Sequence, residues 1–122
     1  MKIAAAAYPL DWFDTWAAYE NKLTGWVSEA AGQGARLLVF PEYGAMELAS
    51  LGGKAVAGDM EGSLREVARH KPVADKLHAK LAAEYAVHIL GASGPAYDMP
   101  FANGRPVNRA SLFGPEGLLG HQ

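Results

Sequence analysis

The segment that most constrains the fold is a short apolar run at residues 36–40, which reads Arg-Leu-Leu-Val-Phe and is followed by Pro41. A continuous run of this length is typical of a strand buried on both faces, in a sheet that helices cover. Before it, large apolar side chains recur every three or four residues, as on one face of an amphipathic helix: Trp16, Tyr19, Leu23, Trp26 or Val27, and Ala30. Glycines at 32 and 34 predict where that helix ends.

Residues 2–8 are expected to form the first strand of the same unit. Alanine is a poor strand former, so this prediction depends on the position of the segment and on Pro9, which ends it. Asp11 or Asp14 is expected to cap the helix that follows. The chain therefore begins with a strand, a helix and a second strand, and the right-handed crossover of such a unit makes the strands parallel.

The middle of the chain predicts two more helical segments. A short helix is expected at 45–51, followed by a loop at 54–58. Ser63 and Glu66 form a possible capping box for a helix over 64–70, which Pro72 interrupts or restarts. A second apolar stripe then runs through Val73, Leu77, Leu81 and Tyr85.

The last third of the chain reads as strands and turns. Residues 87–92 predict the third strand, and the glycine- and proline-rich residues 93–107 predict a loop or a long hairpin with its turn at Asn103-Gly104. Residues 109–113 predict a fourth strand, and residues 118–120 look like the opening of a fifth. We therefore expect an α/β sheet truncated after about four strands, with residues 1–122 as one portion of a single domain.

Composition excludes several classes of function. The formal net charge is −2, from 11 basic and 13 acidic residues, and no basic block provides a surface for nucleic acid. No apolar run reaches the roughly 18 residues that cross a bilayer. We therefore expect neither nucleic acid nor a membrane as a partner, and the absence of a signal-peptide pattern makes the cytoplasm the expected location.

The chain contains no cysteine. This count excludes disulfides, thiolate metal sites and a cysteine nucleophile within these 122 residues. No two histidines have a ligand spacing with an acidic partner, so we expect no metal site and no cofactor. His88 is expected to be a core or interface residue, and His70 and His78 are expected on polar helix faces.

Glu42 is the candidate catalytic residue. It lies just past the carboxyl end of the predicted strand at 36–40, where ligands bind in open α/β sheets. Partial desolvation there would raise the pKa of a carboxyl toward a value useful for proton transfer. The alternative is a purely structural carboxylate that interacts with the dipole of the short helix after it. Asp11 and Glu47 are expected to be capping or solvated carboxylates.

The segment from Leu37 to Gly44, with Phe40-Pro41-Glu42 at its centre, resembles the first signature of the nitrilase superfamily, the carbon–nitrogen hydrolases. The helix and strand at 81–91 resemble the family's elements before its hairpin. Asn108-Arg109-Ala110 and the Gly-Pro-Glu-Gly turn at 114–117 resemble the family's Asn-x-Ala strand and the turn before its lysine. These matches follow the family's order across the whole chain.

The resemblance implies an αββα sandwich, of which this chain is the amino-terminal part. The family hydrolyses amides, nitriles or carbamoyl groups through a Glu-Lys-Cys triad and a covalent thioester. On that basis Glu42 is the general base, and Asn108 is a structural residue near the site. Tyr43 is a candidate for the substrate pocket because sites lie on loops at strand ends, with packing as the alternative. The expected substrate is a small amide or nitrile, and we favour an amide because amides are the commoner class in the family.

The sequence departs from the family at two of the three catalytic positions. No lysine follows Lys80, and no cysteine is present, so we expect this chain to be inactive by itself. The expected partner is a carboxyl-terminal segment or, as in the family, further copies of the same chain. Two other hypotheses stay open: a non-enzymatic interaction module, in which a truncated sheet leaves an open edge and uncovered apolar faces, and a small flavodoxin-like binding domain.

Overall fold

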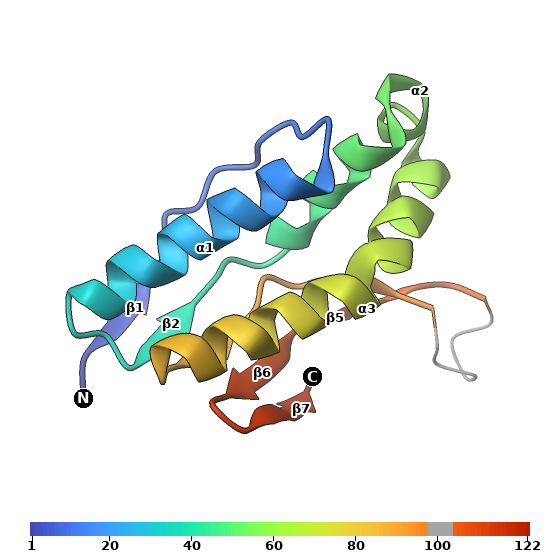
Figure 1. Ribbon diagram of the computed structural model, residues 1–122. Coiled ribbons are helices and arrows are strands. Elements are labelled where there is room, and N and C mark those ends of the chain that lie inside the picture. Colours follow the sequence, from blue (N-terminus) through green and yellow to red (C-terminus); the bar gives the residue numbers. More distant parts are fainter. Residues whose placement is uncertain (98–103) are drawn as a thin grey trace.

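The computed structural model describes residues 1–97 and 104–122, and one mixed sheet organises them (Figure 1). The first half contains β1 (Ile3–Ala5), α1 (Trp16–Gly32), β2 (Leu37–Val39), the 3₁₀ helix η1 (Gly44–Gly52) and α2 (Lys54–Ala57). The second half contains α3 (Met60–Tyr85), β3 (His88–Leu90), β4 (Gly94–Ala96), β5 (Val107–Arg109), β6 (Ser111–Gly114) and β7 (Gly117–His121).

The central sheet has the strand order β1-β2-β3-β6-β7. The first three strands are parallel, as the strand–helix–strand unit predicts, and β6 and β7 are antiparallel additions. A separate antiparallel pair, β4 with β5, occupies the predicted hairpin region, with Pro95 opposite Asn108. Of the predicted turn, Gly104 has the left-handed φ of 74° that glycine favours, whereas Asn103 lies outside the described residues.

Both helix caps differ from the predictions. Thr15, and neither Asp11 nor Asp14, caps α1: its Oγ1 accepts the Ala18 N–H at 3.3 Å. Asp59 caps α3 by accepting the Gly62 N–H at 2.7 Å. The predicted capping box at Ser63 is wrong, because Asp59 starts the helix one turn earlier.

The predicted break at Pro72 and the predicted loop at 54–58 are also wrong. Helix α3 continues through Pro72 for 26 residues, because buried side chains on both sides of it, including Val67 and Leu77, pack the helix against the core. Figure 1 shows α3 bending along its length, as a helix with an internal proline does. Residues 54–57 form the short helix α2.

No helix of the described residues is both long and apolar enough to span a bilayer.

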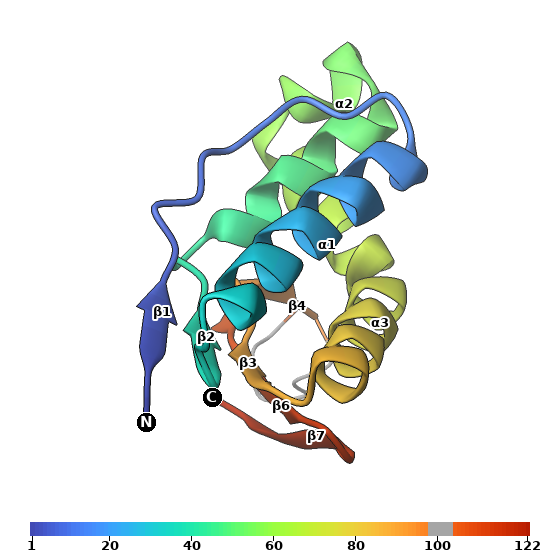
Figure 2. The ribbon, with the colours of Figure 1, turned by 60° about the vertical axis from the view of Figure 1, so that its left-hand side comes forward.

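The core lies on one face of the sheet. Figures 1 and 2 show α1, η1 and α3 on that same face. Leu38, Ile89 and Phe113 point toward the helices and are each 2% exposed or less. The predicted α1 stripe is confirmed, because Tyr19, Leu23 and Val27 are buried against this face. The α3 stripe is confirmed except for Val73, which is exposed.

The opposite face of the sheet is apolar but open. Strand register brings seven side chains to it, and none of them is buried: Ile3, Ala5, Leu37, Val39, His88, Leu90 and Leu112. The predicted burial of the second strand on both faces is therefore wrong for the described residues. His88 is exposed on this face, so it is not a core residue, and its alternative place at an interface stays a prediction.

Candidate active site

Glu42 lies where the sequence predicts, just beyond the carboxyl end of β2. The Phe40 N–H donates to Leu90 O at 3.0 Å, so pairing between β2 and β3 continues until Pro41 ends it. Glu42 then borders a groove of about 360 Å³ with seven other residues: Phe40, Leu90, Gly91, Ser93, Asn108, Ala110 and Gln122. The residue is exposed, so the expected partial desolvation of this carboxylate is not found in the described chain.

Asn108 approaches Glu42 from β5. Its Nδ2 donates a hydrogen bond of 3.1 Å to Glu42 Oε1, and both side chains border the groove. The β4–β5 pair therefore brings together two residues that are 66 positions apart in the sequence. One carboxylate oxygen is held by an amide donor, and this orients the carboxylate.

Tyr43 takes a different position from its neighbour. Its side chain is 54% exposed and is not among the residues that border the groove. Its backbone has a left-handed φ of 59°, and its N–H donates to Ser93 Oγ at 2.8 Å. The predicted role of Tyr43 in a substrate pocket therefore stays a prediction.

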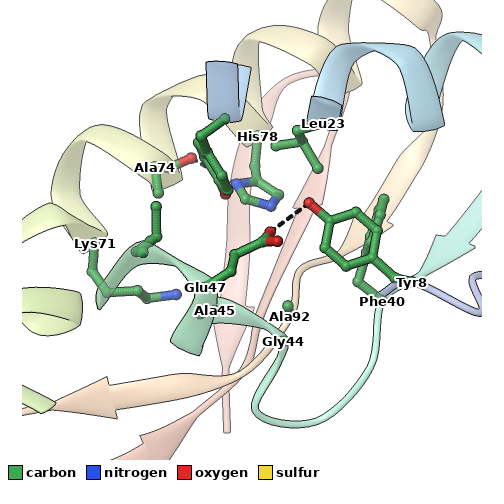
Figure 3. A pocket seen from close by; sticks show the side chains of 12 residues that line it. Tyr8, Leu23, Phe40, Gly44, Ala45, Glu47, Lys71, Ala74, His78 and Ala92 are labelled. Carbon is green, nitrogen blue, oxygen red and sulfur yellow. Dashed lines mark hydrogen bonds between the residues drawn. The ribbon is translucent and has the colours of Figure 1, made fainter. Parts of the chain in front are cut away.

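A buried polar cluster, which the sequence did not predict, is centred on Glu47 of η1, the helix that follows Glu42 and Tyr43. Glu47 of η1 is only 4% exposed, and Figure 3 shows its carboxylate facing the Tyr8 hydroxyl. The hydroxyl donates to Glu47 Oε2 at 2.6 Å, and Lys22 Nζ forms an ion pair with Oε1 at 2.6 Å. The Asp11 N–H donates to Oε1 at 3.3 Å. The expectation of a solvated Glu47 is wrong, because this carboxylate joins η1 to α1 and to the segment after β1.

Burial changes the proton affinities in this cluster. Removal from water raises the pKa of the Glu47 carboxyl above its ordinary value, against the hydrogen bonds from Lys22 and Tyr8. Burial and the hydrogen bond to Glu47 raise the pKa of the Tyr8 hydroxyl, so it stays protonated and acts as the donor. Lys22 Nζ also lies 3.7 Å from the centroid of the Tyr8 ring, a cation–π distance.

His78 is buried too, contrary to its predicted place on a polar helix face. It is 6% exposed and stacks on Phe113 with ring centroids 5.3 Å apart. Its Nδ1 lies 2.6 Å from Ala74 O, and a carbonyl only accepts, so Nδ1 carries the proton. Figure 3 shows the ring beside a core cavity of about 10 Å³ that Glu47 and Tyr8 also border. Burial lowers the pKa of His78 below its ordinary value.

One sequence signal pointed to Glu47. It is the only charged residue of the segment 44–52, in which Gly44, Ala45, Leu48 and Ala49 are buried around it. A lone carboxylate in such an apolar segment needs a partner. No comparable signal marked Lys22 or His78, because their positions along the helices read as polar. In residues 1–97 and 104–122, no group of three or more His, Asp or Glu side chains is placed to hold a metal ion.

Comparison with solved structures identifies the architecture. A carbon–nitrogen hydrolase from Helicobacter pylori superposes with a TM-score of 0.69 at 13% identity, over 98% of this chain and 38% of that one. The chain has the nitrilase fold. An amidase of the nitrilase superfamily from Nesterenkonia sp. gives a TM-score of 0.61 at 20% identity, over 100% of this chain and 42% of its own. A nitrilase-superfamily member from Saccharomyces cerevisiae gives 0.60 at 15% identity, over 94% and 41%.

The chain thus spans about two fifths of the nitrilase-fold structures it matches. No family model matches the sequence, and no curated protein matches it. The fold class expected from the resemblance is confirmed, and these structural matches do not support the flavodoxin-like alternative.

Proposed function

We propose that this chain supplies the general base of a carbon–nitrogen hydrolase that acts on an amide or nitrile through a Glu-Lys-Cys triad. Glu42 is the base, and polypeptide outside these 122 residues provides the lysine and the cysteine. The observation that carries the proposal is the Glu42 carboxylate, held by Asn108 at the border of a groove at the strand end of a nitrilase fold. Residues 1–122 then form the amino-terminal portion of one hydrolase domain.

In each step of the proposed reaction, Glu42 accepts or returns one proton. The carboxylate takes the thiol proton of the cysteine, and the thiolate attacks the carbonyl carbon of an amide. The lysine stabilises the tetrahedral oxyanion, and the leaving amine departs with the proton that Glu42 returns. Water then gives a proton to Glu42 as it attacks the thioester. Glu42 passes this proton to the departing thiolate, so the cysteine thiol and the Glu42 carboxylate are restored and the carboxylic acid is released.

The open apolar face of the sheet supports the need for a partner. Val39, Leu90 and Leu112 are partly exposed on this face. Covering them with another layer removes apolar surface from water, which lowers the free energy. We propose that this layer is supplied by a carboxyl-terminal segment or by further copies of the chain.

We also propose the cytoplasm as the location of the protein.

Reconstitution tests this function. Purified residues 1–122 are expected to show no turnover of short amides or nitriles, because they contain no cysteine. The same residues, joined to the carboxyl-terminal part of a hydrolase of this fold that supplies lysine and cysteine, are expected to hydrolyse at least one amide of the panel. Turnover by residues 1–122 alone would contradict the proposed division of the triad.

The open face also favours a second candidate, a non-enzymatic interaction module. The nucleotide sequence after codon 122 discriminates between the two. A reading frame that continues into a lysine-containing strand and a cysteine-containing turn supports the hydrolase. A stop codon, together with a complex that lacks both residues, supports the module.

A further inference from the structure

The turn that presents Glu42 contains a backbone conformation that needs support. Tyr43 has φ 59° and ψ 9°, in the left-handed region that residues other than glycine rarely adopt. Such residues are strained and persist where the surrounding structure holds them. The N–H of Tyr43 belongs to the peptide unit that joins it to Glu42, so a partner that holds this N–H also fixes the backbone on the carboxyl side of Glu42.

Ser93 holds this turn from the connection between β3 and β4. The residue is 6% exposed, and its Oγ accepts the Tyr43 N–H at 2.8 Å. Its backbone carbonyl accepts the Ala45 N–H at 3.2 Å. Ser93 therefore binds the chain on both sides of Gly44, one contact through its side chain and one through its backbone.

Close packing leaves the turn no room to shift. A Cβ added to Gly44 would lie 2.8 Å from the Ala92 Cβ, and one added to Gly94 would lie 2.8 Å from the Ala45 Cβ. The two segments, 43–45 and 92–94, thus meet with a glycine on each side of the contact. This contact is closer than any side chain at either glycine would allow.

The same connection leads into the strand pair that carries Asn108. Gly94 pairs with Arg109, and Pro95 pairs with Asn108, so β4 places the donor of the Glu42 hydrogen bond. Ser93 is the residue before β4. It therefore links the two supports of Glu42: the turn at Tyr43 and the strand pair of Asn108.

We propose that Ser93 is a positioning residue that aims the Glu42 carboxylate at its groove by holding the Tyr43 N–H. Its catalytic meaning rests on the proposed function, but the positioning itself is a property of the chain of 122 residues. Without the hydroxyl, Tyr43 loses the acceptor that holds its left-handed conformation, and Glu42 Oε1 moves away from Asn108 Nδ2.

The side-chain amide of Asn108 reports this geometry by NMR. The chain has three asparagines and two glutamines, so few side-chain amide signals need to be resolved. Glu42→Ala removes the acceptor and gives the reference position of the free Asn108 amide. We expect Ser93→Ala to shift the Asn108 signal in the same direction, and Ser93→Thr to leave it near the wild-type position.

A matched control separates positioning from loss of stability. Ser63 is 7% exposed and donates to Met60 O within α3, so Ser63→Ala removes a buried hydroxyl at another site. We expect this variant to leave the Asn108 signal in place. If Ser93→Ala does not fold, the isosteric pair Ser93→Thr and Ser93→Val gives the same comparison.

An unshifted Asn108 signal in the folded Ser93→Ala or Ser93→Val protein would overturn the proposal. An equal shift in Ser63→Ala would overturn it as well. These outcomes do not depend on turnover. If Ser93→Ala shifts the signal but the reconstituted wild-type protein is inactive, the proposed function is contradicted and the positioning role of Ser93 stands.

Discussion

Asn108 donates a 3.1 Å hydrogen bond from its side-chain amide to Glu42 Oε1. The contact joins the end of β2 to β5, and it depends on the pairing of β5 with β4. A carboxylate that accepts a proton in the reaction needs a fixed direction as well as a suitable pKa. The hydrogen bond fixes one oxygen and leaves the other available to the groove.

This contact predicts a kinetic effect. In the reconstituted hydrolase, Asn108→Ala is expected to lower kcat about tenfold with little change in KM, since one hydrogen bond to a charged group is worth roughly 1.5 kcal/mol. Asn21→Ala, at an exposed position of α1, is the matched control and is expected to leave kcat unchanged. Steady-state rates of both variants check the prediction, and an unchanged kcat in Asn108→Ala would contradict it.

The pair of Lys22 and Glu47 predicts a large effect on stability. Lys22→Met leaves the Glu47 carboxylate buried without its cation, and losing one partner of a buried pair costs about 3–5 kcal/mol. The double variant Lys22→Met, Glu47→Gln is expected to lose less than the sum of the single variants, because neither charge remains. Urea denaturation followed by tryptophan fluorescence measures each free energy of unfolding.

Lys76→Met is the control for this cycle. Lys76 is exposed on α3, and its substitution is expected to change the free energy of unfolding by less than about 0.5 kcal/mol. Additive losses in the double variant would show that Lys22 and Glu47 do not interact as a pair.

His78 predicts a dependence of stability on pH. Burial lowers its pKa in the folded state, and the charge of Lys71 adds to this, while the hydrogen bond to Ala74 and the charge of Asp75 act in the opposite direction. Because the net effect lowers the pKa, the unfolded chain binds the proton more readily. The contribution of the neutral ring is complete above the unfolded pKa of about 6.5 and is lost as the pH falls below it, by at most about 1.4 kcal/mol per pH unit. Urea denaturation at several pH values between 7.5 and 5 measures the slope.

His78→Gln is expected to remove this part of the slope. His88→Gln, which changes an exposed histidine, is expected to retain it. The same slope in wild type and in His78→Gln would show that other groups cause the loss of stability at low pH.

The contact of Gly44 with Ala92 predicts opposite effects of the same substitution at two glycines. Gly44→Ala places a Cβ 2.8 Å from the Ala92 Cβ and is expected to cost about 1–3 kcal/mol, as overpacking does. Gly25→Ala, in the middle of α1 with no atom within 4 Å of its new Cβ, is expected to stabilise the protein by about 0.5–1 kcal/mol. Denaturation of both variants checks the signs, and a neutral Gly44→Ala would contradict the close approach.

The sequence predicted those features that periodicity and local spacing determine. The strand within the run at 36–40, the α1 stripe and the position of Glu42 after β2 depend on neighbouring residues, and the structure places them as predicted. The burial of that strand on both faces is the part that is not found. The caps were harder to predict, because Asp14 and Thr15 both suit a helix start and their hydrogen bonds depend on the exact entry of the chain. The helix through Pro72 persists because tertiary packing outweighs the loss of one hydrogen bond.

Contacts between distant segments do not follow from local sequence patterns. The burial of Lys22 depends on Tyr8 and Glu47, which lie 14 and 25 residues away from it, and no local pattern brings the three together. Ser93 was overlooked for the same reason, since its role appears only when the turn at Tyr43 is packed against it. The openness of one sheet face was expected only under the hypothesis of a truncated sheet, because the residues of β2 read the same whether a second layer is present or absent.

The most direct test of the central claim is the turnover of the reconstituted hydrolase with Glu42→Gln. The glutamine amide keeps the shape of the side chain but cannot act as a base. We therefore predict a loss of at least about 100-fold in kcat, the lower end for removal of a general base. Glu116→Gln, in the exposed turn between β6 and β7, is the control and is predicted to keep the wild-type rate. A Glu42→Gln protein that hydrolyses its amide at the wild-type rate would contradict the account.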